Sequence, residues 1–236
     1  MTLDFRTRYG DIPVRLVARD GIGRAAKRGV VVMYHGLGSE IGAQTLELHG
    51  LAARGFLAVG VDNIGHGRRR APDFDRRFSG EGSDRRFVEA VDGTARELPE
   101  LLNALHSQGL RWTRVGVTGI SMGGYIAFQT RLYEPRVRAL VPILGNPRWK
   151  FPEPVCAWSR PEHFPPVALY AWNAELDESV PPRFARDFLR VLGPLYREIP
   201  ERLRYEEVAG AGHLMNDVDW RRMWRRTEDW FVEHLM

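Results

Sequence analysis

The chain has 236 residues, of which 44% are hydrophobic and 27% charged, as expected for one globular domain with a large core. The formal net charge is +4, but the basic doublets are scattered and interleaved with acidic residues, which argues against nucleic acid as a partner. The one cysteine, Cys156, excludes an intramolecular disulfide bond and suits a reducing compartment.

Strand patterns open the chain. Residues 3–19 predict two short strands around a turn at Gly10-Asp11, because apolar residues alternate along the second strand. A turn over residues 20–23 and a basic loop follow. Residues 30–34 form a continuous apolar run of the kind found in a parallel strand that is buried on both faces.

The next region predicts a helix, a strand, a loop and a second helix. The first helix covers residues 46–53 and ends at a glycine, and residues 56–62 form another buried strand. An irregular arginine-rich loop is expected over residues 68–82. A long helix over residues 84–106, interrupted by Pro99, comes after it.

The second half continues the alternation. Strands are predicted over 113–118, 137–144, 167–172 and 202–208. One helix is predicted to begin at the turn that follows residue 118 and to end at Tyr133, and two others to cover residues 182–192 and 216–235. This order predicts an α/β fold, a mostly parallel twisted sheet with helices on both faces, in a single domain over residues 1–236. Residues 145–166 are rich in proline and aromatics without a regular period, and predict a short irregular cap-like insertion.

Neither a secretion signal nor a membrane span is expected. Residues 1–6 lack the apolar core of a signal peptide, and no apolar run approaches the length needed to cross a bilayer. We therefore expect a cytoplasmic protein that does not bind membranes. The sequence does not indicate the oligomeric state.

Residues 119–123, Gly-Ile-Ser-Met-Gly, join an apolar β-branched strand to an apolar helix. This is the pattern of a nucleophile elbow, in which a sharp turn exposes the serine hydroxyl. Glycines stand two residues away on either side because a Cβ atom would not fit there. Ser121 is therefore predicted to be a nucleophile. The N–H of Met122 is predicted to point toward an oxyanion formed beside it.

A serine hydroxyl is a poor nucleophile at neutral pH, so an imidazole must accept its proton and a carboxylate must orient that imidazole. In a parallel sheet, such residues come from loops at the carboxyl ends of strands. Of the seven histidines, His213 stands on a glycine-rich turn directly after the last predicted strand. It is the predicted general base.

Three carboxylates compete for the third position, all in the loop after residues 167–172. Asp177 is favoured because it lies near the middle of the loop, just before the next helix. We expect its carboxylate about 2.6–3.2 Å from a ring nitrogen of His213. Glu175 is the runner-up, and Glu178 is better explained as a charge that caps the helix.

The chain resembles the α/β-hydrolase superfamily over nearly its whole length. Four motifs carry the resemblance, and each follows a predicted strand or lies at its end: Tyr34-His35-Gly36-Leu37-Gly38, Asp62-Asn63-Ile64-Gly65-His66-Gly67, Gly119-Ile120-Ser121-Met122-Gly123 and Gly210-Ala211-Gly212-His213. The order serine, aspartate, histidine is also that of the superfamily. Within it, the chain is most similar to compact bacterial serine esterases of the dienelactone-hydrolase-like and prolyl-oligopeptidase-like type. The dienelactone hydrolases themselves have a cysteine where this chain has Ser121.

This resemblance implies that the loop at His35 is the oxyanion loop, with the N–H of Leu37 joining that of Met122 in the oxyanion hole. It also implies that His35 orients this loop and that His66 shapes its own. Both histidines are candidates for the lining of the substrate pocket.

The segment 145–166 supplies four further candidates for the pocket lining, Trp149, Phe151, Trp158 and Phe164. As a cap over the active site, they would line an apolar pocket for small to medium acyl groups. They would equally serve to bury the segment against the sheet, and both interpretations stay open. Arginines lie among them, but arginines are spread over the whole chain.

Together, these observations predict a serine hydrolase that cleaves small carboxylic esters through an acyl-enzyme, with no cofactor and no metal. Peptidase, amidase and thioesterase activities are alternatives, because the same nucleophile and oxyanion hole serve all of them. A hypothesis of another class is a non-catalytic protein that binds a ligand or partner in the same pocket. It is disfavoured because every member of a triad can be assigned.

Overall fold

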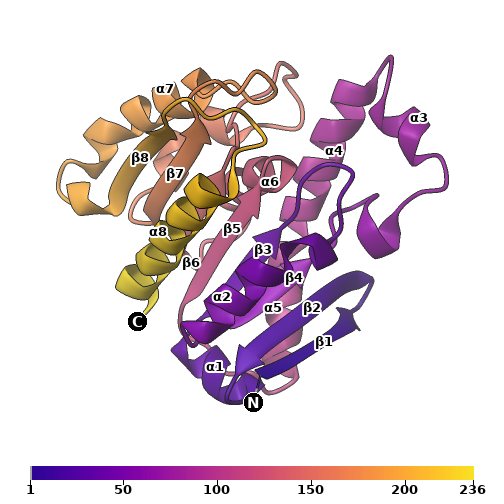
Figure 1. The fold of residues 1–236 in the computed structure, drawn as a ribbon, viewed down its shortest axis with the longest axis vertical. Coiled ribbons are helices and arrows are strands. Elements are labelled where there is room, and N and C mark those ends of the chain that lie inside the picture. The colour runs from indigo at the N-terminus through magenta and orange to yellow at the C-terminus, as the bar shows by residue number, and fades with distance from the viewer. Residues whose placement is uncertain (1) are drawn as a thin grey trace.

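The computed structural model describes residues 2–236, within which eight strands form one twisted sheet (Figure 1). The strands are β1 (Thr2–Tyr9), β2 (Ile12–Arg19), β3 (Val30–Tyr34), β4 (Leu57–Val61), β5 (Val115–Ile120), β6 (Val137–Ile143), β7 (Ala168–Ala174) and β8 (Leu203–Val208). Their order across the sheet is β1-β2-β4-β3-β5-β6-β7-β8. β2 pairs antiparallel with both β1 and β4, and the six strands β4, β3, β5, β6, β7 and β8 pair parallel in that order. The predicted mostly parallel sheet is confirmed.

Helices cover both faces of this sheet. They are α1 (Ile22–Arg28), α2 (Thr45–Ala53), α3 (Phe74–Phe78), α4 (Ser83–Arg96), α5 (Leu98–Ser107), α6 (Met122–Thr130), α7 (Arg183–Leu192) and α8 (Asp217–Leu235). α2 and α8 pack on the face turned to the viewer in Figure 1, and α1, α4, α5, α6 and α7 pack in the other layer. No helix within residues 2–236 is both long and apolar enough to cross a membrane.

The central parallel strands β3, β4 and β5 are almost entirely apolar because both of their faces are buried. In β3, Val30, Val32 and Tyr34 face the core that α4, α5 and α6 cover, whereas Val31 and Met33 face the core under α2 and α8. All five side chains are at most 1% exposed. Successive side chains of a strand point to opposite faces, so a strand between two helical layers reads as a continuous apolar run.

Several predicted boundaries differ from the structure. Residues 22–28, expected in a turn and a basic loop, form α1, because Ala25 and Ala26 are buried against the sheet. α3 lies inside the predicted arginine-rich loop, where Phe74 and Phe78 pack on the ring of His66. The long helix over 84–106 is two helices, α4 and α5. Pro99 stands in the first turn of α5, where a missing N–H is tolerated.

The segment between β6 and β7 forms two short 3₁₀ turns and is otherwise irregular. The ring of Phe164 is fully buried and its centroid lies 5.0 Å from that of Phe188 in α7. Trp158 also packs on Phe188, at 5.5 Å. These two side chains fasten the segment to the core, so the prediction that Trp158 and Phe164 line the substrate pocket is wrong.

Candidate active site

Ser121 stands between the end of β5 and the start of α6, in a backbone conformation that side chains rarely adopt. Its φ is 56° and its ψ is −115°. Hydrogen bonds hold this turn, since the Ser121 N–H donates to the Ile143 carbonyl at 2.9 Å and the Ser121 carbonyl accepts from the Gly124 N–H at 2.7 Å. The surrounding sheet and helix therefore maintain the strained turn that the sequence pattern predicts.

The glycines of this turn are required by backbone contacts. A Cβ atom on Gly119 would overlap the carbonyl group of Gly123, and a Cβ atom on Gly123 would overlap the carbonyl group of Tyr34 at the end of β3. Neither obstacle is a flexible side chain. Because the elbow packs this tightly, the start of α6 lies directly against the loop after β3.

His213 bridges Ser121 and Asp177. Its Nε2 lies 3.1 Å from the Ser121 Oγ, and its Nδ1 lies 2.7 Å from the Asp177 Oδ2. An ionised carboxylate only accepts hydrogen bonds, so Nδ1 carries the proton and Nε2 is free to accept the one on the serine hydroxyl. The Asp177 side chain is 0% exposed and that of His213 is 25% exposed. The distance to Asp177 lies within the range expected from the sequence.

Asp177 is fixed by a second hydrogen bond, because its Oδ1 accepts from the Val180 N–H at 2.8 Å. Glu175, the runner-up in the sequence, follows directly after β7 and is exposed. Its Oε2 accepts from the N–H of Gly210 at 2.8 Å and does not reach the imidazole. The two carboxylates therefore contact different parts of the turn that carries His213.

The backbone N–H groups of Leu37 and Met122 are the predicted oxyanion donors. Leu37 lines the same pocket as Ser121, and Met122 is the first residue of α6. Within residues 2–236, neither N–H donates a hydrogen bond to the backbone of another loop or turn. Gly36 passes so close to the elbow that a Cβ atom on it would contact the Ser121 Cβ at 3.7 Å. The two N–H groups are thus on segments that flank Ser121.

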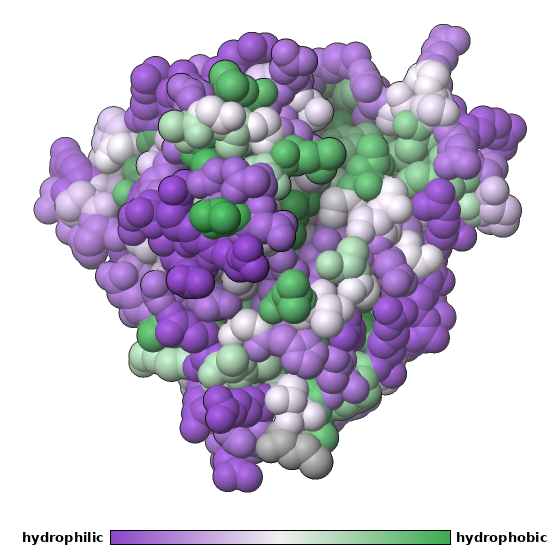
Figure 2. All heavy atoms as spheres, in the orientation of Figure 1, coloured by the Kyte–Doolittle hydropathy of each residue, from purple (hydrophilic) through white to green (hydrophobic). Residues whose placement is uncertain are grey.

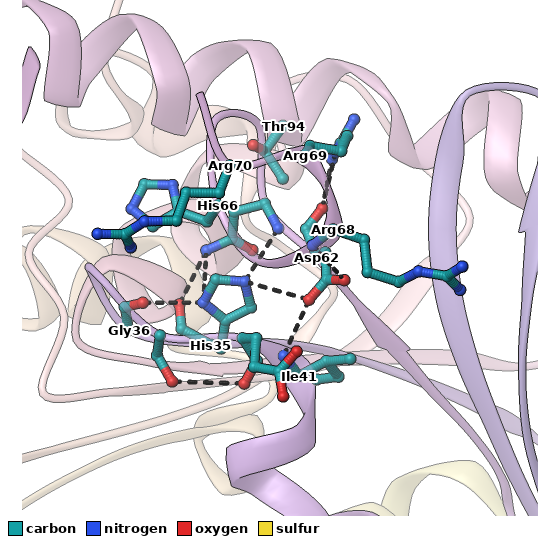
Figure 3. A network of polar contacts seen from close by, with 12 residues as sticks. His35, Gly36, Ile41, Asp62, His66, Arg68, Arg69, Arg70 and Thr94 are labelled. Atoms are coloured by element: carbon teal, nitrogen blue, oxygen red, sulfur yellow. Dashed lines mark hydrogen bonds and ion pairs between the residues drawn. The ribbon is translucent and has the colours of Figure 1, made fainter. Parts of the chain in front are cut away.

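His35 holds the loop that carries Leu37 (Figure 3). Its Nδ1–H donates to the Gly36 carbonyl at 2.8 Å, and its Nε2 accepts from the Asn63 N–H at 3.1 Å. The Asn63 amide donates in turn to the His35 carbonyl at 2.9 Å. Burial lowers the pKa of His35 to about 4, so the ring is neutral near pH 7. It fixes the loop and takes no part in the pocket.

Asp62 and His66 organise the loop after β4 behind the site. The Asp62 carboxylate accepts from the N–H groups of Ile41 and Arg68, at 2.9 and 3.1 Å (Figure 3). The His66 residue is 0% exposed, its ring packs against the rings of Phe74 and Phe78, which also contact each other, and burial lowers its pKa. The prediction that His35 and His66 line the pocket is therefore wrong, because both rings are enclosed within the protein.

The pocket in front of Ser121 has a volume of about 620 Å³. Figure 2 shows apolar atoms gathered in a hollow between the α7 and α4 sides of the molecule. The lining residues that sequence reasoning missed come from segments spread along the chain: Ser39, Gln44, Phe87, Ile120, Tyr125, Leu144, Ser179, Val180, Leu214, Met215 and Trp220. Trp149 and Phe151, which were predicted to line it, border a neighbouring hollow instead.

One missed residue had a signal in the sequence. Tyr125 comes four residues after Ser121 on α6, so it lies on the same face of that helix. Burial raises its pKa to about 12, so the hydroxyl stays protonated. Trp220 had no such signal, because its indole is positioned by a hydrogen bond of 2.8 Å from Nε1 to Glu47 on α2, far away in the sequence. Residues 2–236 contain no cluster of ligands suited to a metal ion.

A family model described as serine aminopeptidase, S33, matches residues 25–199 of this chain. The matched range includes Ser121 and Asp177 and ends before His213. No curated protein sequence matches the chain.

Solved structures share the fold over the full length of the chain. A protein from Thermus thermophilus is 23% identical, with a TM-score of 0.76 and coverage of 98% of both chains. A putative dienelactone hydrolase from Klebsiella pneumoniae is 16% identical, with a TM-score of 0.75, and the match covers 99% of this chain and 100% of that one. An acylaminoacyl peptidase from Pyrococcus horikoshii is also 16% identical, with a TM-score of 0.71. The match covers 100% of this chain but only 42% of the peptidase.

Proposed function

Because the chain belongs to the serine aminopeptidase S33 family of α/β-hydrolases, we propose that Ser121, His213 and Asp177 form a catalytic triad that cleaves carboxylic esters of small to medium acyl chains. The observation that carries the proposal is the position of His213, with one ring nitrogen 3.1 Å from the Ser121 Oγ and the other 2.7 Å from Asp177. This is the arrangement in which an imidazole accepts a serine proton.

In the acylation step, the Ser121 Oγ attacks the ester carbonyl carbon while its proton moves to the His213 Nε2. The C=O π bond opens and its electron pair becomes the oxyanion, which the N–H groups of Leu37 and Met122 stabilise. The carbonyl then re-forms, the bond to the leaving oxygen breaks, and His213 gives its proton to that oxygen. The alcohol leaves, and the acyl group remains on Ser121 as an ester.

In the deacylation step, His213 takes a proton from water as the water oxygen attacks the acyl carbon. The same two N–H groups stabilise the second oxyanion. Its collapse breaks the bond to the Ser121 Oγ, which recovers its proton from His213, and the carboxylic acid leaves. Asp177 keeps its negative charge and stabilises the imidazolium in both steps.

The lining of the pocket favours an ester over a peptide with a free amino terminus. An aminopeptidase has to bind the α-ammonium group of its substrate, and a carboxylate is the side chain suited to that charge. Within residues 2–236, the side chains that line the Ser121 pocket include no aspartate or glutamate. Asp177 lies behind His213 and is engaged by it. The family description nevertheless makes aminopeptidase activity the second candidate.

The test is a panel of substrates that differ in the scissile bond. It contains p-nitrophenyl esters from acetyl to dodecanoyl, aminoacyl p-nitroanilides with free amino groups, and acyl-thioesters. We expect the highest kcat/KM for the short and medium esters, and an acyl group trapped on Ser121 in mass spectra of the quenched reaction. A higher kcat/KM for the free aminoacyl anilides would favour the aminopeptidase instead. No turnover of any substrate would favour a binding protein.

A further inference from the structure

A second hollow of about 460 Å³ lies beside the active-site pocket. Its walls come from α4, from α6, from the first turn of α7 and from the segment that follows β6. The lining residues are Asp84, Phe87, Val88, Tyr125, Asn146, Arg148, Trp149, Lys150, Phe151 and Phe184. The mechanism described above uses none of its charged side chains.

The two hollows share a wall. Phe87 and Tyr125 line both of them, and their rings meet edge to face with centroids 5.2 Å apart. Tyr125 stands one helical turn after Ser121 on α6. The second hollow is therefore adjacent to the active-site pocket, and this aromatic pair forms the boundary between the two.

Half of the ten residues that line the second hollow are aromatic. A dry apolar cavity of about 150 Å³ is enough to bind benzene, so its volume accommodates an aromatic ring with substituents. The segment that supplies the outer wall is held in place by two hydrogen bonds. The Trp149 Nε1 donates to the Pro154 carbonyl at 2.8 Å, and the Arg148 N–H donates to the buried Asn146 side chain at 2.9 Å.

Three charged side chains line the hollow, and their charges do not cancel. Lys150 pairs with Asp84, with its Nζ 2.6 Å from a carboxylate oxygen. Within the described chain, Arg148 has no carboxylate oxygen within 4.0 Å. Its guanidinium lies 5.3 Å from the Trp158 ring centroid. Two further guanidinium groups lie over the aromatic walls, Arg85 over Phe151 and Arg183 over Phe184. The uncompensated charge is therefore positive.

The position of His213 decides which part of an ester enters this hollow. His213 protonates the leaving oxygen, so the leaving group must lie beside it, near Leu214 and Met215. These residues line the active-site pocket but not the second hollow. The acyl group extends away from the leaving oxygen, and Phe87 and Tyr125, which line both hollows, lie outside the His213 turn.

From these observations we propose that the second hollow binds the acyl end of the substrate, and that the preferred acyl group is an aromatic ring that carries a carboxylate. The ring packs among the aromatic side chains and its carboxylate pairs with Arg148. This proposal rests on the proposed esterase function, whose substrate class it narrows.

The test compares two p-nitrophenyl esters that differ only in charge, those of 3-(4-carboxyphenyl)propanoic acid and 3-(4-carbamoylphenyl)propanoic acid. In the wild type, we expect kcat/KM for the carboxylate to exceed that for the amide by about two- to fivefold, the range for a solvent-exposed ion pair. Arg148→Gln should bring this ratio to about one, and Arg148→Glu should reverse it. Arg160→Gln, an exposed arginine of the same segment outside the hollow, should leave the ratio unchanged.

A binding experiment separates this proposal from the esterase assignment. Calorimetry of Ser121→Ala protein with the two free acids should show tighter binding of the 4-carboxy compound, and Arg148→Gln should remove the difference. Arg148-dependent binding without hydrolysis of either ester would support the proposed acyl-binding site and overturn the proposed esterase function. Hydrolysis with the same ratio of kcat/KM for the two esters in the wild type and in Arg148→Gln would overturn the proposed acyl-binding site and leave the esterase function standing. Absence of both hydrolysis and binding would also overturn the proposed acyl-binding site.

Discussion

Glu175 is tied to Gly210: its Oε2 accepts a hydrogen bond of 2.8 Å from the Gly210 N–H. This contact joins the loop after β7 to the glycine-rich turn that carries His213. Next to it, the Leu176 N–H donates to the Ala211 carbonyl, also at 2.8 Å. The two loops are therefore joined by main-chain and side-chain contacts, and Asp177, two residues further on, is brought to the imidazole.

This arrangement separates the roles of the two carboxylates. We expect Asp177→Asn to lower kcat by about 10⁴-fold, because an amide in place of Oδ2 can leave His213 in the wrong tautomer. Glu175→Gln keeps an oxygen that can accept from Gly210, so its kcat should stay within about threefold of the wild type. Steady-state kinetics on one ester check both. A large loss in Glu175→Gln with little loss in Asp177→Asn would reverse the assignment.

Ser121→Ala should lower kcat by about 10⁴-fold or more, because the triad acts as a unit and its residual activity comes from binding and the oxyanion donors. A fluorophosphonate probe should label the wild type on Ser121 and leave the variant unlabelled. The thermal unfolding temperature serves as the control, since the loss of one hydroxyl should not unfold the chain. Retained activity in the folded variant would refute the assignment of Ser121 as the nucleophile.

Gly123→Ala should lower the free energy of unfolding by about 3 kcal/mol, the upper part of the range for overpacking, because its Cβ atom would overlap the Tyr34 carbonyl group. Gly193→Ala is the matched control. Gly193 lies at the end of α7 with helical dihedral angles, and a Cβ atom there would meet nothing within 4 Å. Denaturant titration of both variants checks this. Equal stabilities would show that the elbow relaxes around the added methyl group.

Stability should fall between pH 6.5 and pH 4 because of His35. The folded protein lowers the pKa of His35 from 6.5 to about 4, so in this window the unfolded chain binds a proton that the folded chain does not. By linkage, the free energy of unfolding decreases as the pH falls, by about 3 kcal/mol once pH 4 is reached.

Urea denaturation at intervals across this range measures the decrease. The slope of the free energy of unfolding against pH reports how many more protons the unfolded chain binds than the folded chain. In His35→Gln, this slope should be shallower, by an amount that corresponds to up to one proton in the middle of the window. The variant should also be less stable at pH 7, because the bonds to Gly36 and Asn63 are disturbed. Identical slopes in the two proteins would show that His35 does not titrate in this way.

The sequence alone determined the sheet and the position of the sharp turn that carries Ser121. Continuous apolar runs such as residues 30–34 identify strands between two helical layers, because both faces of each strand are buried. The glycines on either side of Ser121 indicate a turn with no room for a Cβ atom, and the structure shows backbone atoms filling that space. Both patterns depend only on residues that are close together in the chain, so they can be recognised in a single sequence.

Tertiary structure decided everything that depends on distant segments meeting. The sequence could only rank Asp177 above Glu175, and the pairing of β7 with β8 sets which carboxylate reaches His213. The aromatic residues of 145–166 looked alike in sequence, yet Phe164 is in the core and Phe151 lines the second hollow. Whether a side chain is buried or lines a pocket depends on packing between elements far apart in the chain. The spacing of residues within one element therefore does not predict it.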